Sequence, residues 1–153
     1  MQIKVRTWQE EDALALYQMS MHPYYLRKRI WRYLYPDTFL HAMSTIQFYQ
    51  CADPTRFLFR ALECDGVVCG FLECEKKSSE CGELSYWLDV NYWNQGIMQE
   101  GVRQLCIEAF KCLSILCIFA RVDKKNEPSS QVLIHNGFQR ESLEDYYIFR
   151  KYK

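Results

Sequence analysis

The chain has 153 residues, of which 49% are hydrophobic and 16% aromatic, which is enough apolar material for one packed domain over residues 1–153. Its 19 basic and 19 acidic residues cancel, which argues against a general binder of nucleic acid or of membrane surfaces. No apolar run approaches the roughly 20 residues of a bilayer span. The start Met1–Arg6 lacks the apolar core of a signal peptide, so a cytoplasmic protein is expected.

The first third of the chain has the pattern of a strand followed by two helices. Polar and apolar residues alternate over Ile3–Trp8, which predicts a strand, and Glu10–Ser20 carries the apolar stripe of a helix. Pro23 ends that helix, because proline cannot continue the hydrogen-bond ladder. A second helix is predicted from Pro36 to about Gln50.

The middle of the chain is predicted to be an antiparallel meander. Arg56–Glu63 and Val67–Glu75 are strands joined at Asp65-Gly66, and Asp-Gly between alternating apolar runs is a strong hairpin signal. Glu83–Val90 is the next strand. Its side chains are expected to place Trp87 on one face and three others on the opposite face, namely Leu84, Tyr86 and Leu88.

The last third is predicted to contain two further helices and three strands. Gly96 opens a helix to about Leu113, with an apolar stripe formed by Met98, Val102, Leu105, Ala109 and Phe110. Ile115–Val122 is an apolar strand, expected to be fully buried and parallel to its neighbour. A helix over Pro128–His135 is stopped by Asn136-Gly137, and a final hairpin pairs Phe138–Glu141 with Tyr146–Tyr152.

A polar turn, Asn91–Gln95, leads directly into the helix that starts at Gly96. The first N–H groups of a helix have no partner inside it, and the helix dipole adds positive potential there. Without a Cβ, Gly96 lets a ligand approach the backbone closely. An anion site, most often for phosphate, is the physical expectation. The turn lacks the Gly-Lys-Ser/Thr ending of a P-loop and the three glycines of a dinucleotide fold.

Two motifs resemble a known family. The stretch Tyr86–Glu100 reads Tyr-Trp-Leu-Asp-Val-Asn-Tyr-Trp-Asn-Gln-Gly-Ile-Met-Gln-Glu and is similar to the acetyl-CoA loop of the GNAT N-acetyltransferases. It is closest to the branch that acetylates ribosomal-protein N-termini, the ribosomal-protein-alanine N-acetyltransferases. A second stretch, Asn126–Phe138, is similar to the family's Asn-x-x-Ser helix and its Gly-Phe ending. Met98 replaces the small residue of the general loop, and Gln99 replaces the threonine usual in this branch.

The resemblance implies the GNAT fold, an α/β (α+β) architecture with a mixed, mostly antiparallel central sheet flanked by helices. It implies acetyl-CoA as co-substrate and no metal. The pyrophosphate is expected on the loop and helix start, which comprise Gln95, Gly96, Ile97, Met98 and Gln99. The pantetheine arm is expected along the backbone of Leu88, Asp89 and Val90, with Asn126 at the arm or at an ordered water. Alternatively, Asn126 is only a cap for the following helix.

Three side chains are candidates for proton transfer. Ser129 matches the branch's serine near the cofactor sulfur and is a candidate donor to the departing thiolate, or else a first-turn helix serine. Glu83 and Asp145 are candidate bases, and the alternative for each is a surface carboxylate. Many family members carry a tyrosine acid on the last helix, where this chain has Leu133.

The resulting hypothesis is transfer of acetyl from acetyl-CoA to a primary amine, either a protein N-terminus or a small molecule, by direct attack in a ternary complex. The protein would act as a monomer or homodimer, without nucleic-acid or membrane partners. The alternative is a non-catalytic module that binds acyl-CoA. The basic and aromatic run Arg27–Tyr33 offers nucleic-acid or acceptor contact, or a plain amphipathic helix. The eight cysteines have no Cys-x-x-Cys pair, which favours a reduced core over metal binding.

Overall fold

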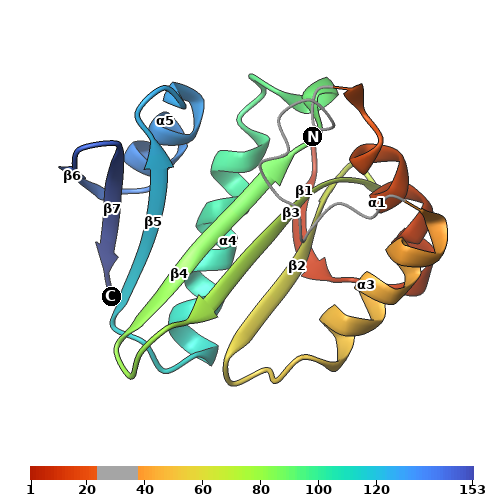
Figure 1. The fold of residues 1–153 in the computed structure, drawn as a ribbon, viewed down its shortest axis with the longest axis horizontal. Coiled ribbons are helices and arrows are strands. Elements are labelled where there is room, and N and C mark those ends of the chain that lie inside the picture. Colours follow the sequence, from red (N-terminus) through yellow and green to blue (C-terminus); the bar gives the residue numbers. More distant parts are fainter. Residues whose placement is uncertain (24–37) are drawn as a thin grey trace.

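A computed structural model describes residues 1–23 and 38–153 of the chain. At its centre is a seven-stranded sheet with the spatial order β1-β2-β3-β4-β5-β7-β6 (Figure 1). All neighbouring strands are antiparallel except β4 and β5, so the sheet is mixed and mostly antiparallel, as predicted. The strands are β1 Ile3–Thr7, β2 Phe57–Cys64, β3 Val67–Lys76, β4 Cys81–Leu88, β5 Cys117–Asp123, β6 Gln139–Ser142 and β7 Tyr146–Tyr152.

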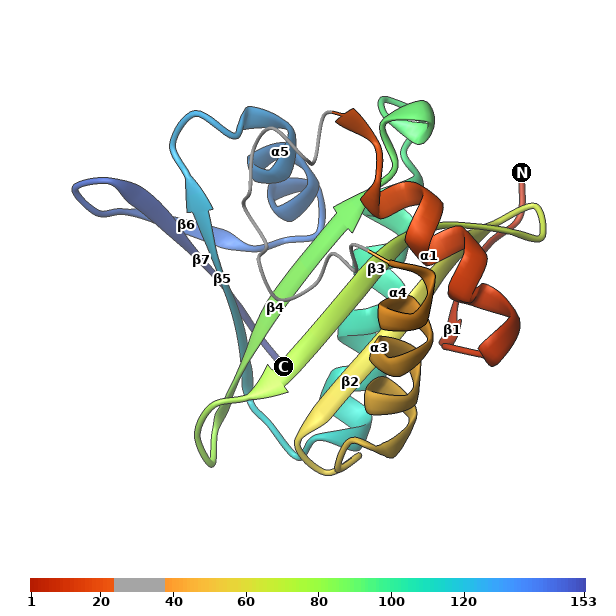
Figure 2. The same ribbon diagram turned by 45° about the vertical axis from the view of Figure 1, so that its right-hand side comes forward.

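Helices cover both faces of this sheet. On one face lie α1, Ala13–Ser20, and α3, Phe39–Cys51, which contact each other, while α4, Ile97–Cys112, lies across the opposite face (Figure 2). The helix α5, Glu127–His135, follows β5 and packs against α4. Two short 3-10 turns, η1 at Glu10–Asp12 and η2 at Val90–Tyr92, complete the described elements.

Strand alternation divides the core into two clusters, one on each face. Leu84 of β4 packs against α4 together with Leu72 and Leu105, and Tyr86 and Leu88 lie on the same side. Trp87 packs on the other side, beneath α1 and α3, where its ring stacks on Phe71 at a centroid distance of 6.4 Å. The predicted division of β4 into two faces is therefore confirmed, and it decides which residues face which side of the site.

Several boundaries differ from the sequence prediction. In the described residues the second helix begins at Phe39 rather than Pro36, because Thr38 is extended and its hydroxyl caps the helix by accepting from His41 N at 3.0 Å. The expectation that β5 is fully buried is wrong. Within the predicted range, Leu116 and Arg121 are exposed, whereas Ile118, Ala120 and Val122 are buried, so one face of the strand is not fully covered. Arg27–Tyr33 lies outside the described residues.

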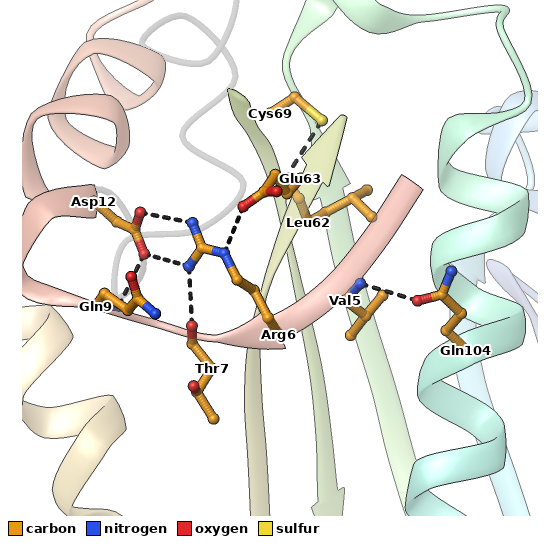
Figure 3. A network of polar contacts seen from close by, with 9 residues as sticks. All are labelled: Val5, Arg6, Thr7, Gln9, Asp12, Leu62, Glu63, Cys69 and Gln104. Atoms are coloured by element: carbon orange, nitrogen blue, oxygen red, sulfur yellow. Dashed lines mark hydrogen bonds and ion pairs between the residues drawn. The ribbon is translucent and has the colours of Figure 1, made fainter. Parts of the chain in front are cut away.

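A polar network fastens β1 to the start of α1 and to β2 (Figure 3). The guanidinium of Arg6 donates to both carboxylate oxygens of Asp12, at 2.7 and 2.9 Å, and to Glu63 at 2.6 Å. Asp12 also accepts from Gln9 N at 2.8 Å, so this buried carboxylate is well satisfied. These charged hydrogen bonds, those to Asp12 foremost, raise the pKa of Arg6. On the other side of β1, Gln104 of α4 bonds the backbone of β1.

All eight cysteines are free thiols, and six of them are buried or half-buried. Within residues 1–23 and 38–153, no group of three or more potential ligand side chains is arranged to hold a metal ion. No helix in those same ranges has the length and hydropathy needed to cross a bilayer.

Candidate active site

The main irregularity of the sheet is the short contact between β4 and β5. The two strands pair only where Cys81–Glu83 lies beside Cys117–Phe119. Beyond this three-residue seam they diverge, as both ribbon views show (Figures 1 and 2). From Leu84 onward, β4 has no strand pairing on its β5 side among the described residues. The backbones of β4 and β5 therefore form a wedge, whose wide end lies between the end of β4 and α5.

The start of α4 lies next to the wide end of this wedge. Gly96 is its N-cap with φ +75°, a left-handed conformation, and a Cβ built there would meet no atom within 4 Å. The first helical hydrogen bond runs from Glu100 N to Gly96 O at 3.2 Å, so the N–H groups of Ile97, Met98 and Gln99 precede the ladder. Gly96 brings no capping side chain, and the space where its Cβ would lie is open. These features fit a phosphate group of acetyl-CoA.

The turn between β4 and α4 is held by its own polar groups. Trp93 Nε1 donates to the carbonyl of Leu88 at 2.9 Å, and Asp89 Oδ1 accepts from Asn91 N, also at 2.9 Å. Gln95 Nε2 donates to the carbonyl of Asn91 at 3.3 Å. The predicted cofactor residues at the end of β4 and at the start of α4 therefore belong to one ordered turn, with η2 and its first residue Val90 between them.

The helix α5 closes the other side of the wedge. Asn126 caps it by accepting from Ser129 N at 3.3 Å, so its capping role is present. The hydroxyl of Tyr86 crosses from β4 and donates to the carbonyl of Ser129 at 3.1 Å. Asn136 Nδ2 donates to the carbonyl of Gln99 at 3.1 Å, which ties the end of α5 to the start of α4. The two sequence motifs thus meet in space.

The two candidate bases lie far from each other. The carboxylate of Glu83 lies at the seam and pairs with Arg121 at 2.8 Å and with Lys77 at 3.7 Å. Asp145 is exposed in the turn before β7, next to Tyr146, which pairs with the last residue of β5. Glu83 lies beside Phe119 of β5, and Tyr146 lies beside Asp123, four residues further along the same strand. Glu83 and Tyr146 are therefore about 13 Å apart along β5. One reacting amine cannot touch both carboxylates.

Sequence reasoning missed two residues at this site. Burial raises the pKa of Tyr86, which keeps its hydroxyl protonated beside Ser129. Glu73 of β3 is enclosed on the face beneath α3. Burial, reinforced by the carboxylates of Glu75 and Glu83, raises the pKa of Glu73 to about 7. The signal in the sequence was a glutamate at the alternation position of Phe71, which a buried aromatic face does not otherwise favour.

A comparison of the sequence with models of known protein families agrees with this geometry. The profile of the acetyltransferase (GNAT) domain matches residues 2–139. The chain belongs to this GNAT family. The predicted family and fold are therefore confirmed, and acetyl-CoA is the co-substrate of GNAT enzymes.

Individual relatives show how far the likeness extends. An uncharacterized N-acetyltransferase, p20 of Bacillus licheniformis, is 34% identical over 90 residues, which are 58% of this chain. The chain spans about half the length of that curated relative, 50%. The structure of RimL, a ribosomal L7/L12 alpha-N-protein acetyltransferase, in complex with coenzyme A has a TM-score of 0.82 at 17% identity. The match covers 98% of this chain and 93% of that one.

A second solved structure is that of the microcin C7 self-immunity acetyltransferase MccE in complex with acetyl-CoA and AMP. It has a TM-score of 0.83 at 15% identity, over 99% of this chain and 93% of that one. At these identities the likeness concerns the GNAT fold alone. The fold alone does not determine the acceptor, which depends on the side chains that this chain presents at the site.

Proposed function

We propose that residues 1–153 form one N-acetyltransferase domain that transfers acetyl from acetyl-CoA to a primary amine, by direct attack in a ternary complex. The observation that carries the proposal is the unpaired edge of β4 beyond the seam, next to the open, glycine-capped start of α4. A cytoplasmic location is part of the proposal and is supported by the eight free thiols. The protein acts as a monomer or homodimer.

Binding of acetyl-CoA rests mainly on backbone groups. The N–H groups of Ile97, Met98 and Gln99 hold the pyrophosphate, and the absence of a side chain at Gly96 gives it access. The pantetheine arm lies along Leu88–Val90 and supplies hydrogen bonds on the side where β4 lacks β5. A backbone N–H at this edge polarises the thioester carbonyl as negative charge develops on its oxygen.

Departure of the thiolate requires a proton donor on the α5 side. Ser129 is half-buried, and its hydroxyl makes no hydrogen bond to another described residue, so the hydroxyl is available for a ligand. Tyr86 holds the backbone of Ser129 in place. Asn126, which caps α5, contacts the arm or an ordered water. Ser129 donates to the sulfur, and the loss of one such positioned acid costs about 100-fold in rate or more.

The decisive experiment is an acceptor screen that follows release of free thiol from acetyl-CoA. The panel contains small primary amines and short peptides with free N-termini, each run beside its N-acetylated counterpart. Thiol release that depends on a free amine supports acetyl transfer. Binding of acetyl-CoA without release for any free amine contradicts it.

A non-catalytic acyl-CoA-binding module is the second candidate. One observation favours it: the two carboxylate oxygens of the candidate base Glu83 pair with Arg121 and Lys77, so neither oxygen is left open to a reacting amine. Both candidates predict binding of acetyl-CoA, so turnover in the same screen separates them.

A further inference from the structure

Three carboxylates lie on the same face of β3 and β4, and their surroundings differ. Glu75 pairs with Lys77 at 2.5 Å and with Arg56 at 3.2 Å, and Glu83 pairs with Arg121 and Lys77. Glu73 makes no hydrogen bond or ion pair within residues 1–23 and 38–153. Of these three carboxylates, Glu73 is therefore the one without an ion pair in the described part of the chain.

The position of Glu73 relates it to the wedge. In the register of the sheet it lies directly opposite Ser85 of β4, two residues beyond the end of the seam. Adjacent strands are about 4.8 Å apart, so Glu73 lies one strand from the unpaired edge of β4. On its other side it faces Phe59 of β2.

A second polar group without a partner lies close to Glu73. The hydroxyl of Tyr49 on α3 is buried, the residue being 8% exposed, and has no hydrogen-bond partner among the described residues. Burial, together with the negative charge of Glu73, raises the pKa of Tyr49. The ring of Tyr49 stacks on Phe59 at 4.6 Å and lies 5.6 Å from Phe71, so aromatic faces surround the pair.

We propose that Glu73, with Tyr49 above it and Ser85 beside it, binds the primary ammonium group of the acceptor and removes its proton. This inference rests on the proposed acetyl transfer and specifies its acceptor: a primary ammonium on an apolar or aromatic group. The carboxylate supplies the missing charge partner, and the rings of Tyr49 and Phe71 favour a cation with apolar substituents.

The proposed step balances in protons and charge. The ammonium gives one proton to the Glu73 carboxylate and becomes an amine. Its nitrogen attacks the thioester carbon, the C–S bond breaks, and the second proton lost from nitrogen is balanced by the proton that the thiolate receives. The products are the acetylated amine, coenzyme A as a thiol, and one proton that Glu73 returns to solvent.

The charged groups around Glu73 determine its pH dependence. Glu75 on β3 and Glu83 on β4 raise its pKa, Lys77 lowers it, and Tyr49 on α3 is neutral below the alkaline range. Arg121 of β5 is engaged by Glu83. A base with a pKa of about 7 is deprotonated above that pH, so the rate is expected to rise as the pH passes through about 7.

The carboxylate of Glu73 also affects folding stability, which is expected to fall as the pH rises, whereas the rate is expected to increase. Its pKa in the folded protein is above the usual value of 4.5, so its contribution to stability is greatest at low pH and is lost as the pH rises through about 7. Glu73→Gln removes the buried charge. At pH 8 this variant is therefore expected to melt at a higher temperature than wild type, which checks the burial of the charge; amine binding and the pH profile test the role in catalysis.

The test compares Glu73→Gln, Glu83→Gln and Glu75→Gln with wild type, in protein saturated with coenzyme A for the binding measurements and in protein supplied with acetyl-CoA for the rate measurements. Calorimetry measures binding of 2-phenylethylamine, with the neutral 2-phenylethanol as the charge control, and thiol release is followed from pH 5.5 to 9. Glu73→Gln is expected to weaken binding of the amine alone by about 10-fold and to lower kcat/KM by about 100-fold. Glu75→Gln is expected to keep amine binding and to move the pH midpoint downward, because a like charge is removed.

The outcomes separate this inference from acetyl transfer itself. Amine binding that is equal in Glu73→Gln and wild type overturns the amine site, whatever the turnover, and so does a larger rate loss in Glu83→Gln than in Glu73→Gln. Amine binding that depends on Glu73, without thiol release in wild type, supports the amine site and refutes acetyl transfer.

Discussion

At the scale of single residues, Gly96 is subject to two separate requirements. Its φ of +75° is costly for any residue with a Cβ, and the space where that Cβ would lie is the space proposed for a phosphate. Gly66, in the turn between β2 and β3, has φ +84° and equally open surroundings, but a turn is its only evident role. The two glycines therefore form a matched pair for experiment.

Gly96→Val is expected to abolish the rise in melting temperature that acetyl-CoA produces, since a ligand bound only by the native state stabilises by mass action. Gly66→Val carries similar backbone strain and is expected to lower the melting temperature while keeping the ligand-induced rise. Thermal melts of both variants with and without acetyl-CoA measure this. An undiminished rise in Gly96→Val would mean that the anion site lies elsewhere.

Two adjacent serines of α5 provide a second comparison. Ser129 has the available hydroxyl described above, whereas Ser130 is fully buried and its hydroxyl has no partner among the described residues. Ser129→Ala is expected to lower kcat about 100-fold and to leave the affinity for coenzyme A unchanged, because the phosphate site is made of backbone. Ser130→Ala removes an unsatisfied buried group and is expected to keep activity. Steady-state kinetics with direct titration of coenzyme A separates the two effects, and equal kcat in both variants would exclude Ser129 as the acid.

At the scale of elements, the unpaired edge of β4 is the feature that we expect a ligand to affect most. Acetyl-CoA is expected to slow amide hydrogen exchange in residues 84–90 and 95–99, where new hydrogen bonds to the arm and phosphates form. The hairpin of β6 and β7 makes no proposed contact and serves as the internal control. Exchange measured by mass spectrometry reports both regions in one experiment. Protection confined to the control hairpin would contradict the proposed binding mode.

The attachment of β1 to α1 depends on one arginine. Arg6→Met leaves the buried Asp12 carboxylate without its bidentate partner and is expected to cost about 2 kcal/mol of folding free energy. In a chain of this length that corresponds to roughly 6 °C in melting temperature. Arg103→Met breaks an ion pair of similar length whose arginine is 54% exposed, and it is expected to change the melting temperature little. Equal losses in the two variants would show that burial does not determine the cost.

The same elements show what the sequence was able to predict. Alternation in β4, the Asp65-Gly66 turn and the stripe of α4 depend on neighbouring residues, and these predictions are confirmed. The number of residues over which β4 and β5 pair was not predictable. It depends on how the two strands are placed in three dimensions after the chain has passed through α4. Glu73 was missed for a similar reason: that it makes no ion pair with the described residues is visible only once β2, β4 and α3 are in place.

At the scale of the whole molecule, six of the eight thiols are packing groups, and Cys51 and Cys112 are exposed. Burial raises the pKa of Cys106 to about 11, and Cys69 and Cys74 are likewise raised, which keeps them protonated and unreactive at neutral pH. Melting temperatures are therefore expected to be the same with and without reductant, and with a chelator as a third condition. A large fall in either treatment would reveal a disulfide or metal that holds the fold.

The short seam between β4 and β5 also has a mechanical meaning. The chain passes from β4 to β5 once, through α4. The elements up to α4 form one part, which carries the loop at Gly96, and β5 with the elements after it forms a second part, which carries Ser129. A molecule bound between the two parts is expected to keep them apart. Acyl groups longer than acetyl would have to push the two parts further apart. That movement would stretch the hydrogen bonds from Tyr86 to Ser129 and from Asn136 to Gln99. Those two hydrogen bonds would then limit the length of the acyl chain that the protein accepts.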